Sequence, residues 1–166
     1  MYKILLSISF INILLLIAEV ALGFAASKHD VRLMNYHALL GLFTALFFCL
    51  MHSICVFHLI GSGKDIKEAS KILNEHSEIV EAVRIFKRQV APWAYSSIFL
   101  IMAAAISGAG VHTMAFSAVV HKIIWITAIL VNIYTFIVEY RAVKENLMLM
   151  YLVDMRLAEL EGKDSK

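Results

Sequence analysis

The stretch ILLSISFINILLLIAEVALGFAA, residues 4–26, decides the fold of this chain. It contains one charged residue, Glu19, and it is longer than the roughly 20 apolar residues that a helix needs to cross the hydrocarbon layer of a bilayer. It also exceeds the roughly 7–15 apolar residues of a secretory signal peptide. We therefore expect a retained membrane anchor rather than a cleaved leader.

Three further apolar runs follow and predict three more membrane-crossing helices. We expect these helices at about residues 36–60, 92–110 and 116–139. Gly61-Ser62-Gly63 is typical of a helix end, and Pro92 is typical of a helix start. Over the whole chain 61% of residues are hydrophobic and 17% are charged, whereas a soluble domain has about 45–50% and about 25%. The predicted fold class is an all-α integral membrane protein, a four-transmembrane-helix bundle that forms a single membrane domain over residues 1–166.

Two polar segments lie outside these runs, at residues 64–90 and 140–161. Apolar side chains recur in both at the three- and four-residue spacing of a helix with one apolar face. We expect amphipathic helical extensions on the cytoplasmic side. Because single short helices are rarely stable alone, the extensions should pack on each other; docking of a partner protein is the alternative.

Lysine and arginine are distributed unevenly about the predicted helices. Twelve of the 15 lie before the first helix, within residues 64–90 or after the fourth helix, and three lie toward the opposite side. Short segments rich in these residues stay in the cytoplasm. We therefore expect both chain ends to be cytoplasmic and the membrane to be of the bacterial inner (plasma) type.

Histidines gather in the outer half of the predicted bundle. His37 and His121 each begin a helix from the outer side, share one depth and lie on the inward stripe of their helices. Glu19 lies about 10 Å deep at 1.5 Å per residue, Gly41 follows His37 by one turn, and His112 is in the outer loop. Polar side chains inside membrane helices are costly, so we expect them to face the bundle interior and to mark a site.

Two inward imidazoles at one depth on different helices are typical of a bis-histidine haem site, because each can bind one face of the iron. With its four spans, His37 and His121, the chain resembles small membrane cytochromes of the b type. The resemblance implies electron transfer by haem b, held between the second and fourth helices near the outer face. His37 and His121 would be the axial ligands, with Gly41 leaving room for the porphyrin edge and Glu19 nearby.

Other functions remain open from the sequence. The histidines could be interfacial side chains in a structural or accessory subunit, with Glu19 joining helices through a hydrogen bond to one of them. A Zn, Fe or Cu ion could bind His37, His121 and His112, with His52 a weaker choice. A small transporter is a further alternative. Expected partners are the lipid bilayer and either other membrane subunits or further copies of the chain, with no nucleic acid; no motif favours a stand-alone enzyme.

A second polar layer is expected about 20 Å from the outer boundary, by the same rise per residue. It consists of Asn12, His52, Ser97 and Asn132. No second histidine lies at this depth. His52 would therefore need a methionine as a second ligand, or else a hydrogen bond to Asn12 or Asn132.

Overall fold

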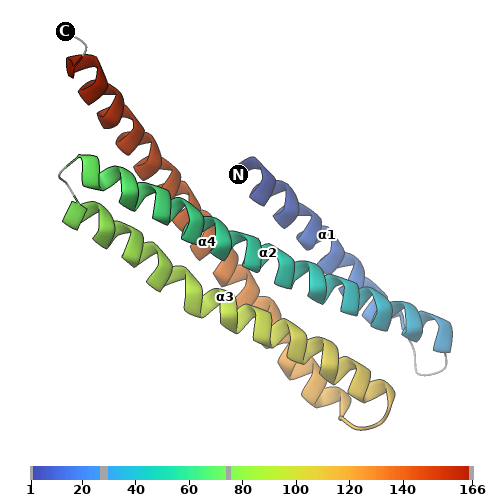
Figure 1. Cartoon of the computed structure of the whole chain (residues 1–166). Coiled ribbons are helices and arrows are strands. Elements are labelled where there is room, and N and C mark those ends of the chain that lie inside the picture. Colours follow the sequence, from blue (N-terminus) through green and yellow to red (C-terminus); the bar gives the residue numbers. More distant parts are fainter. Residues whose placement is uncertain (1, 27–29, 74–75, 165–166) are drawn as a thin grey trace.

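The computed structural model describes residues 2–26, 30–73 and 76–164, and this part of the chain is helical apart from short connections. The helices are α1 (Tyr2–Ala25), α2 (Val31–Ile72), α3 (His76–His112) and α4 (Ala118–Asp164) (Figure 1). Each is long and apolar enough to cross a membrane. The prediction of an all-helical chain with four such helices is confirmed.

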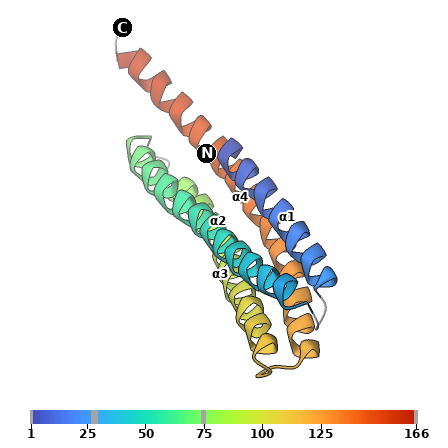
Figure 2. The same ribbon diagram turned by 90° about the vertical axis from the view of Figure 1, so that its right-hand side faces the viewer.

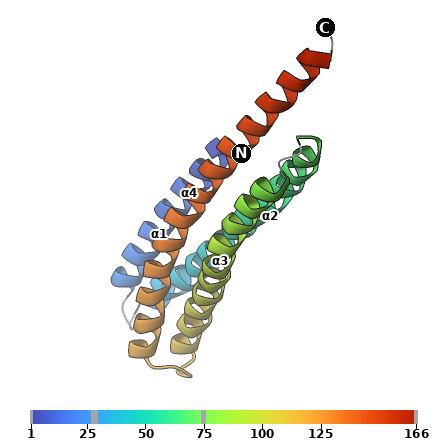
Figure 3. The same cartoon turned by 90° about the vertical axis from the view of Figure 1, so that its left-hand side faces the viewer.

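Helices α2 and α3 form a long hairpin, and α4 packs along both of them. Helix α1 packs mainly against α2 and touches α4, and among the described residues it shares no contact with α3. The start of α1, the α2–α3 connection and the end of α4 point toward one end of the molecule (Figure 2). Helices α2, α3 and α4 continue past the start of α1, and α4 extends furthest (Figure 3).

The outward faces of all four helices carry exposed apolar side chains. One large example from each helix is Phe24 at 83% exposure, Phe57 at 70%, Phe99 at 73% and Leu130 at 63%. A water-facing surface rarely exposes apolar side chains on this scale, whereas lipid tails solvate them without cost. The surface therefore agrees with the membrane-type composition of the helices.

The helix end predicted at Gly61-Ser62-Gly63 is wrong, because α2 continues to Ile72. Ser62 Oγ donates to the His58 carbonyl at 2.8 Å and accepts from Asn146 Nδ2 of α4 at 2.8 Å. A Cβ atom on Gly63 would lie 2.6 Å from Val83 Cγ1 of α3. These small residues thus allow close helix packing within a continuous helix, which a sequence pattern does not distinguish from a stop.

The start of the third helix at Pro92 is also wrong, because α3 begins at His76 and Pro92 lies inside it. Proline removes one backbone N–H from the helix, which frees the carbonyl of Arg88 four residues earlier. The neighbouring turn is joined to α4, because Thr135 Oγ1 lies 3.2 Å from the Trp93 carbonyl. Residues 64–90 are consequently divided between the end of α2 and the start of α3.

The extensions of α2, α3 and α4 pack on one another, as the apolar spacing predicted. Their shared core contains Ile66 of α2, Ile79 and Val83 of α3, and Val153 of α4, all at least nine-tenths buried. The side of the membrane on which this core lies stays a prediction.

Candidate functional site

A cavity of about 460 Å³ lies in the half of the bundle where α1 joins α2 and α3 joins α4. We call it the outer cavity. All four helices contribute to its walls. The predicted site residues that line it are Glu19, His37, Gly41, His112 and His121. The structure therefore brings together the residues that the sequence placed in the outer half.

His37 of α2 lies between a carboxyl group and a glycine of α1. Its Nδ1 is 3.3 Å from Glu19 Oε1, although the two atoms are not aligned as a hydrogen bond. A Cβ atom on Gly23 would lie 2.8 Å from His37 Cε1, so the ring packs directly on the α1 backbone. Gly41 makes room for Glu19 in the same way, since a Cβ atom there would be 3.3 Å from Oε1.

His121 of α4 is held by a hydroxyl group of α3. Ser107 Oγ donates to the Ala104 carbonyl at 3.0 Å and lies 3.1 Å from His121 Nδ1. The hydroxyl has one proton, so it must accept from Nδ1–H in this arrangement. A Cβ atom on Gly108 would lie 3.0 Å from His121 Cε1, which puts this ring against a glycine as well.

The two imidazoles differ in the bonding of their ring nitrogens. Ser107 accepts from Nδ1–H of His121, which leaves the lone pair of that ring on Nε2. Histidines that bind metals usually donate the other ring N–H to a carboxylate or another acceptor, which fixes the tautomer and the ring orientation. His121 therefore has the arrangement of a metal ligand, whereas His37 has a carboxyl group 3.3 Å from Nδ1 and no hydrogen bond to it.

The walls of the outer cavity are mainly apolar and include several small residues. Alanines line the cavity on both α2 and α3, at residues 38, 45, 104, 105 and 109. Thr44 Oγ1 is buried beside them and has no hydrogen-bond partner in the described parts of the chain. Such walls suit a largely apolar ligand with a few polar contacts.

His112 is the last residue of α3 and is exposed. Within residues 2–26, 30–73 and 76–164, no three His, Cys, Asp or Glu side chains lie close enough to hold a metal ion. The alternative of an ion bound by His37, His121 and His112 is thus not supported by this arrangement and stays a prediction.

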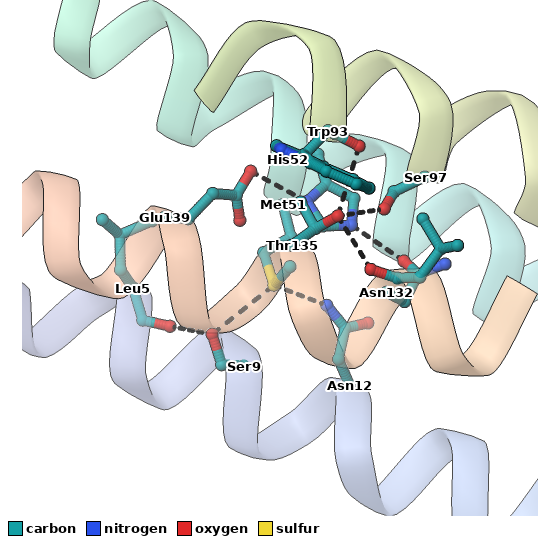
Figure 4. Close-up of polar contacts among 11 residues, drawn as sticks. Leu5, Ser9, Asn12, Met51, His52, Trp93, Ser97, Asn132, Thr135 and Glu139 are labelled. Atoms are coloured by element: carbon teal, nitrogen blue, oxygen red, sulfur yellow. Dashed lines mark hydrogen bonds and ion pairs between the residues drawn. The ribbon is translucent and has the colours of Figure 1, made fainter. Parts of the chain in front are cut away.

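The deeper layer is centred on His52, which is fully buried. Its Nδ1 lies 2.9 Å from Glu139 Oε1, and its Nε2 lies 2.9 Å from Asn132 Oδ1 (Figure 4). The hydrogen bond expected with Asn132 is confirmed. Because both ring nitrogens are engaged, a metal could bind His52 only after one of these bonds was broken.

Glu139 is the member of this layer that sequence reasoning missed. It follows Asn132 by seven residues, so the two share one face of α4, and that spacing was the available signal. The fourth span was expected to end at about Glu139, yet this side chain is only 4% exposed. The long continuous α4 and its neighbours cover it.

The other polar residues of the layer also join helices (Figure 4). Asn12 Nδ2 of α1 donates to Met51 Sδ of α2 at 3.1 Å. Ser97 Oγ of α3 lies 2.6 Å from Thr135 Oγ1 of α4.

Comparisons of the chain with protein families, with curated proteins and with solved structures found no match.

Proposed function

We propose that this chain is a small membrane electron-transfer protein that binds one haem b in the outer cavity, with His37 and His121 as axial ligands. The observation that carries the proposal is the placement of the two imidazoles. They stand on different helices and line one cavity, with Nδ1 of His121 bonded to Ser107 and Nδ1 of His37 lying 3.3 Å from Glu19. Iron in haem is commonly held by imidazole through a single ring nitrogen.

The walls of the cavity fit a macrocycle. Its volume of about 460 Å³ is that of a cofactor-sized pocket, and the linings from α2 and α3 combine alanines with larger apolar side chains such as Leu42 and Met102. The bound group would supply one-electron oxidation and reduction. The residues of this chain would hold the group and keep water out through the apolar walls.

The residues around the histidines have positioning roles in this proposal. Ser107 orients the ring of His121 and makes it a stronger ligand by accepting from Nδ1–H, and Glu19 places a carboxyl group 3.3 Å from Nδ1 of His37. Gly23 and Gly108 let each ring lie against a neighbouring helix. The redox partner would be another membrane or soluble protein.

We further infer the orientation from the charges. The start of α1, the end of α2, the start of α3 and the end of α4 lie toward one end of the molecule, and eleven of the 15 lysines and arginines belong to those segments, while Lys166 lies outside the described residues. The positive-inside rule places that end in the cytoplasm of a cell with a bacterial-type inner membrane. A reporter fused after Lys166 should read as cytoplasmic; an extracytoplasmic reading would reverse the orientation.

The test of the haem proposal is a reduced-minus-oxidised absorption spectrum of protein purified from membranes with haem supplied during expression. The wild type should give the sharp band of six-coordinate haem. His37→Ala and His121→Ala should each abolish the band, since either change removes one of the two ligands. His58→Ala is the matched control, because His58 is also partly buried in α2 but does not line the outer cavity.

Two results would contradict the proposal: a colourless wild type, or a band that survives both histidine substitutions.

One feature favours an accessory subunit as the second function. The α4 extension exposes an apolar stripe formed by Met148, Tyr151, Leu152 and Met155, at 66%, 63%, 47% and 45% exposure. A colourless protein that copurifies with a larger membrane complex would support that function.

A further inference from the structure

His52 and Glu139 form a buried ionisable pair that the proposed haem site does not use. His52 comes from α2 and Glu139 from α4, and they are 0% and 4% exposed. Figure 4 shows the imidazole held between Glu139 on one side and Asn132 on the other. Both contacts measure 2.9 Å, so each is short enough to be a hydrogen bond that contains one proton.

Asn132 decides which protons the imidazole carries. Its Nδ2 donates to the Ala128 carbonyl at 2.7 Å, and a carbonyl can only accept. The amide oxygen of Asn132 therefore faces His52, and Nε2 must carry a hydrogen to donate to it. This assignment leaves Nδ1 of His52 as the only ring nitrogen whose proton can change.

The contact between Nδ1 and Glu139 Oε1 then requires one proton. Without it, two lone pairs would face each other at 2.9 Å and the pair would carry one negative charge. With one proton, the pair is either imidazolium and carboxylate or imidazole and carboxylic acid, and its net charge is zero. With two protons, it carries one positive charge. Uncompensated charge is costly in a membrane interior, so the state with one proton is favoured.

No other charge near the pair compensates it among the described residues that pack around it. Helix α1 presents Ser9 and Asn12, and α3 presents Ser97, none of which is charged. The titratable neighbours are Cys55 of α2 and Tyr140 of α4, both neutral as ordinarily protonated. The proton between His52 and Glu139 therefore sets the charge of this layer.

The pair borders a small cavity on one side. This inner cavity has a volume of about 20 Å³, enough for one water molecule, and lies between the start of α1, α2 and α4. Glu139 lines it together with Ser9. Leu5 and Leu6, in the first turns of α1, line it, so the inner cavity lies close to the end of the bundle where α1 begins.

An apolar cluster closes the opposite side. Ala45, Phe48, Ile101, Ala104 and Ala128 pack together between the pair and the outer cavity, and all are buried. The Phe48 ring lies 6.3 Å from the His52 ring, centre to centre. Asn132 cannot pass a proton onward, because its amide is not an acid or base under ordinary conditions.

We propose that His52 and Glu139 form a proton-binding site inside the membrane that exchanges protons only toward the end of the bundle where α1 begins. The bound species is a hydrogen ion. A water in the inner cavity delivers one proton to Glu139, the pair shares it between Oε1 and Nδ1, and exchange with solvent returns one proton for each one taken. The site loads from one side and does not conduct protons across the membrane.

The first experiment follows protonation by infrared spectroscopy of the full-length protein in lipid nanodiscs during a pH titration. The carboxyl signal of Glu139 and the ring signal of His52 should change in the same pH step, as one shared site requires. Glu139→Gln should remove this step and Glu139→Asp should retain it, because the aspartate keeps a carboxyl group. Separate steps for the two groups, or an unchanged step in Glu139→Gln, would overturn the proposal.

The second experiment measures the direction of exchange from the rate at which the same signal shifts in D₂O. Ser9→Leu fills the inner cavity and should slow the exchange severalfold. Thr44→Val also removes a hydroxyl group, but from the wall of the outer cavity. It should therefore leave the exchange rate unchanged. Slowing by Thr44→Val, or no slowing by Ser9→Leu, would refute one-sided access. Both experiments give their result without haem, so they remain decisive if the haem proposal fails.

Discussion

The outer cavity and the deeper layer each contain a glutamate paired with a histidine, yet the two pairs are built differently. Glu19 and His37 are 3.3 Å apart, poorly aligned and beside a cavity of about 460 Å³. Glu139 and His52 are 2.9 Å apart, and the histidine is bonded at both nitrogens. A histidine with an open nitrogen beside a cavity can bind a ligand, whereas one bonded at both nitrogens can only hold helices and protons.

The surroundings explain this difference. Glycines at positions 23, 41 and 108 let the side chains of His37, Glu19 and His121 lie against neighbouring helices in the outer half. In the deeper layer the neighbours of His52 are polar and closely packed, and Asn132, Ser97 and Thr135 are all at least nine-tenths buried. The same residue types therefore have different chemistry because the packing around them differs.

The largest expected effect comes from His52→Ala. It leaves the Glu139 carboxyl and the amide oxygen of Asn132 without their His52 partner in the interior, and loss of one member of a buried pair costs about 3–5 kcal/mol. His37→Ala, whose ring is partly exposed and poorly bonded, should cost less than about 1 kcal/mol. The comparison uses unfolding by a denaturing detergent in bicelles. Equal losses for the two variants would remove the distinction between the pairs.

A smaller effect is expected from added methyl groups beside the rings. In Gly23→Ala the new Cβ would lie 2.8 Å from His37 Cε1, and in Gly108→Ala it would lie 3.0 Å from His121 Cε1. Each ring must shift, at about 1–3 kcal/mol for overpacking, so haem content after purification should fall. Gly61→Ala is the matched control, since a Cβ atom there meets nothing within 4 Å. If haem content falls equally in the Gly61→Ala control, the loss does not come from contact between the new methyl group and a histidine ring.

The smallest effect is expected from Glu19→Gln. The amide keeps an acceptor oxygen near His37 but loses the negative charge, so the protein should fold while the proposed haem becomes easier to reduce. Haem affinity should fall by the equivalent of less than about 1 kcal/mol, the value of a partly exposed ion pair. Redox titration measures the reduction potential, and a haem-binding titration measures the affinity. If the variant matches the wild type in potential and in affinity, Glu19 has no role in the outer site.

Much of the outer site was predictable because it depends on local periodicity. His37, His121 and Glu19 were placed by counting residues along helices of fixed rise, and rise and period are properties of the backbone. The role of Gly41 was less predictable. The expectation was room for a ligand edge, and the structure places the Glu19 carboxyl beside it. Which neighbour fills the space at a glycine depends on the rotation of a second helix, which no single helix specifies.

The ends of the helices were the least predictable feature of the fold. Gly61, Gly63 and Pro92 are strong local signals, but α2 and α3 continue through all three positions. Gly63 lies against Val83, and Trp93 beyond the proline gains a bond from Thr135. Tertiary contacts stabilise these helices by more than the local preferences of the residues cost.

The sequence by itself determined that this chain forms four helices able to cross a membrane. The length of each apolar run and its helical period depend only on the order of residues within that run. It also determined which polar side chains share one face of each helix. Only the tertiary structure decided that Glu139 pairs with His52 and that His37 and His121 line one cavity. Pairing across helices depends on the depth, rotation and separation of two helices at once, and those quantities are set by how all four helices pack.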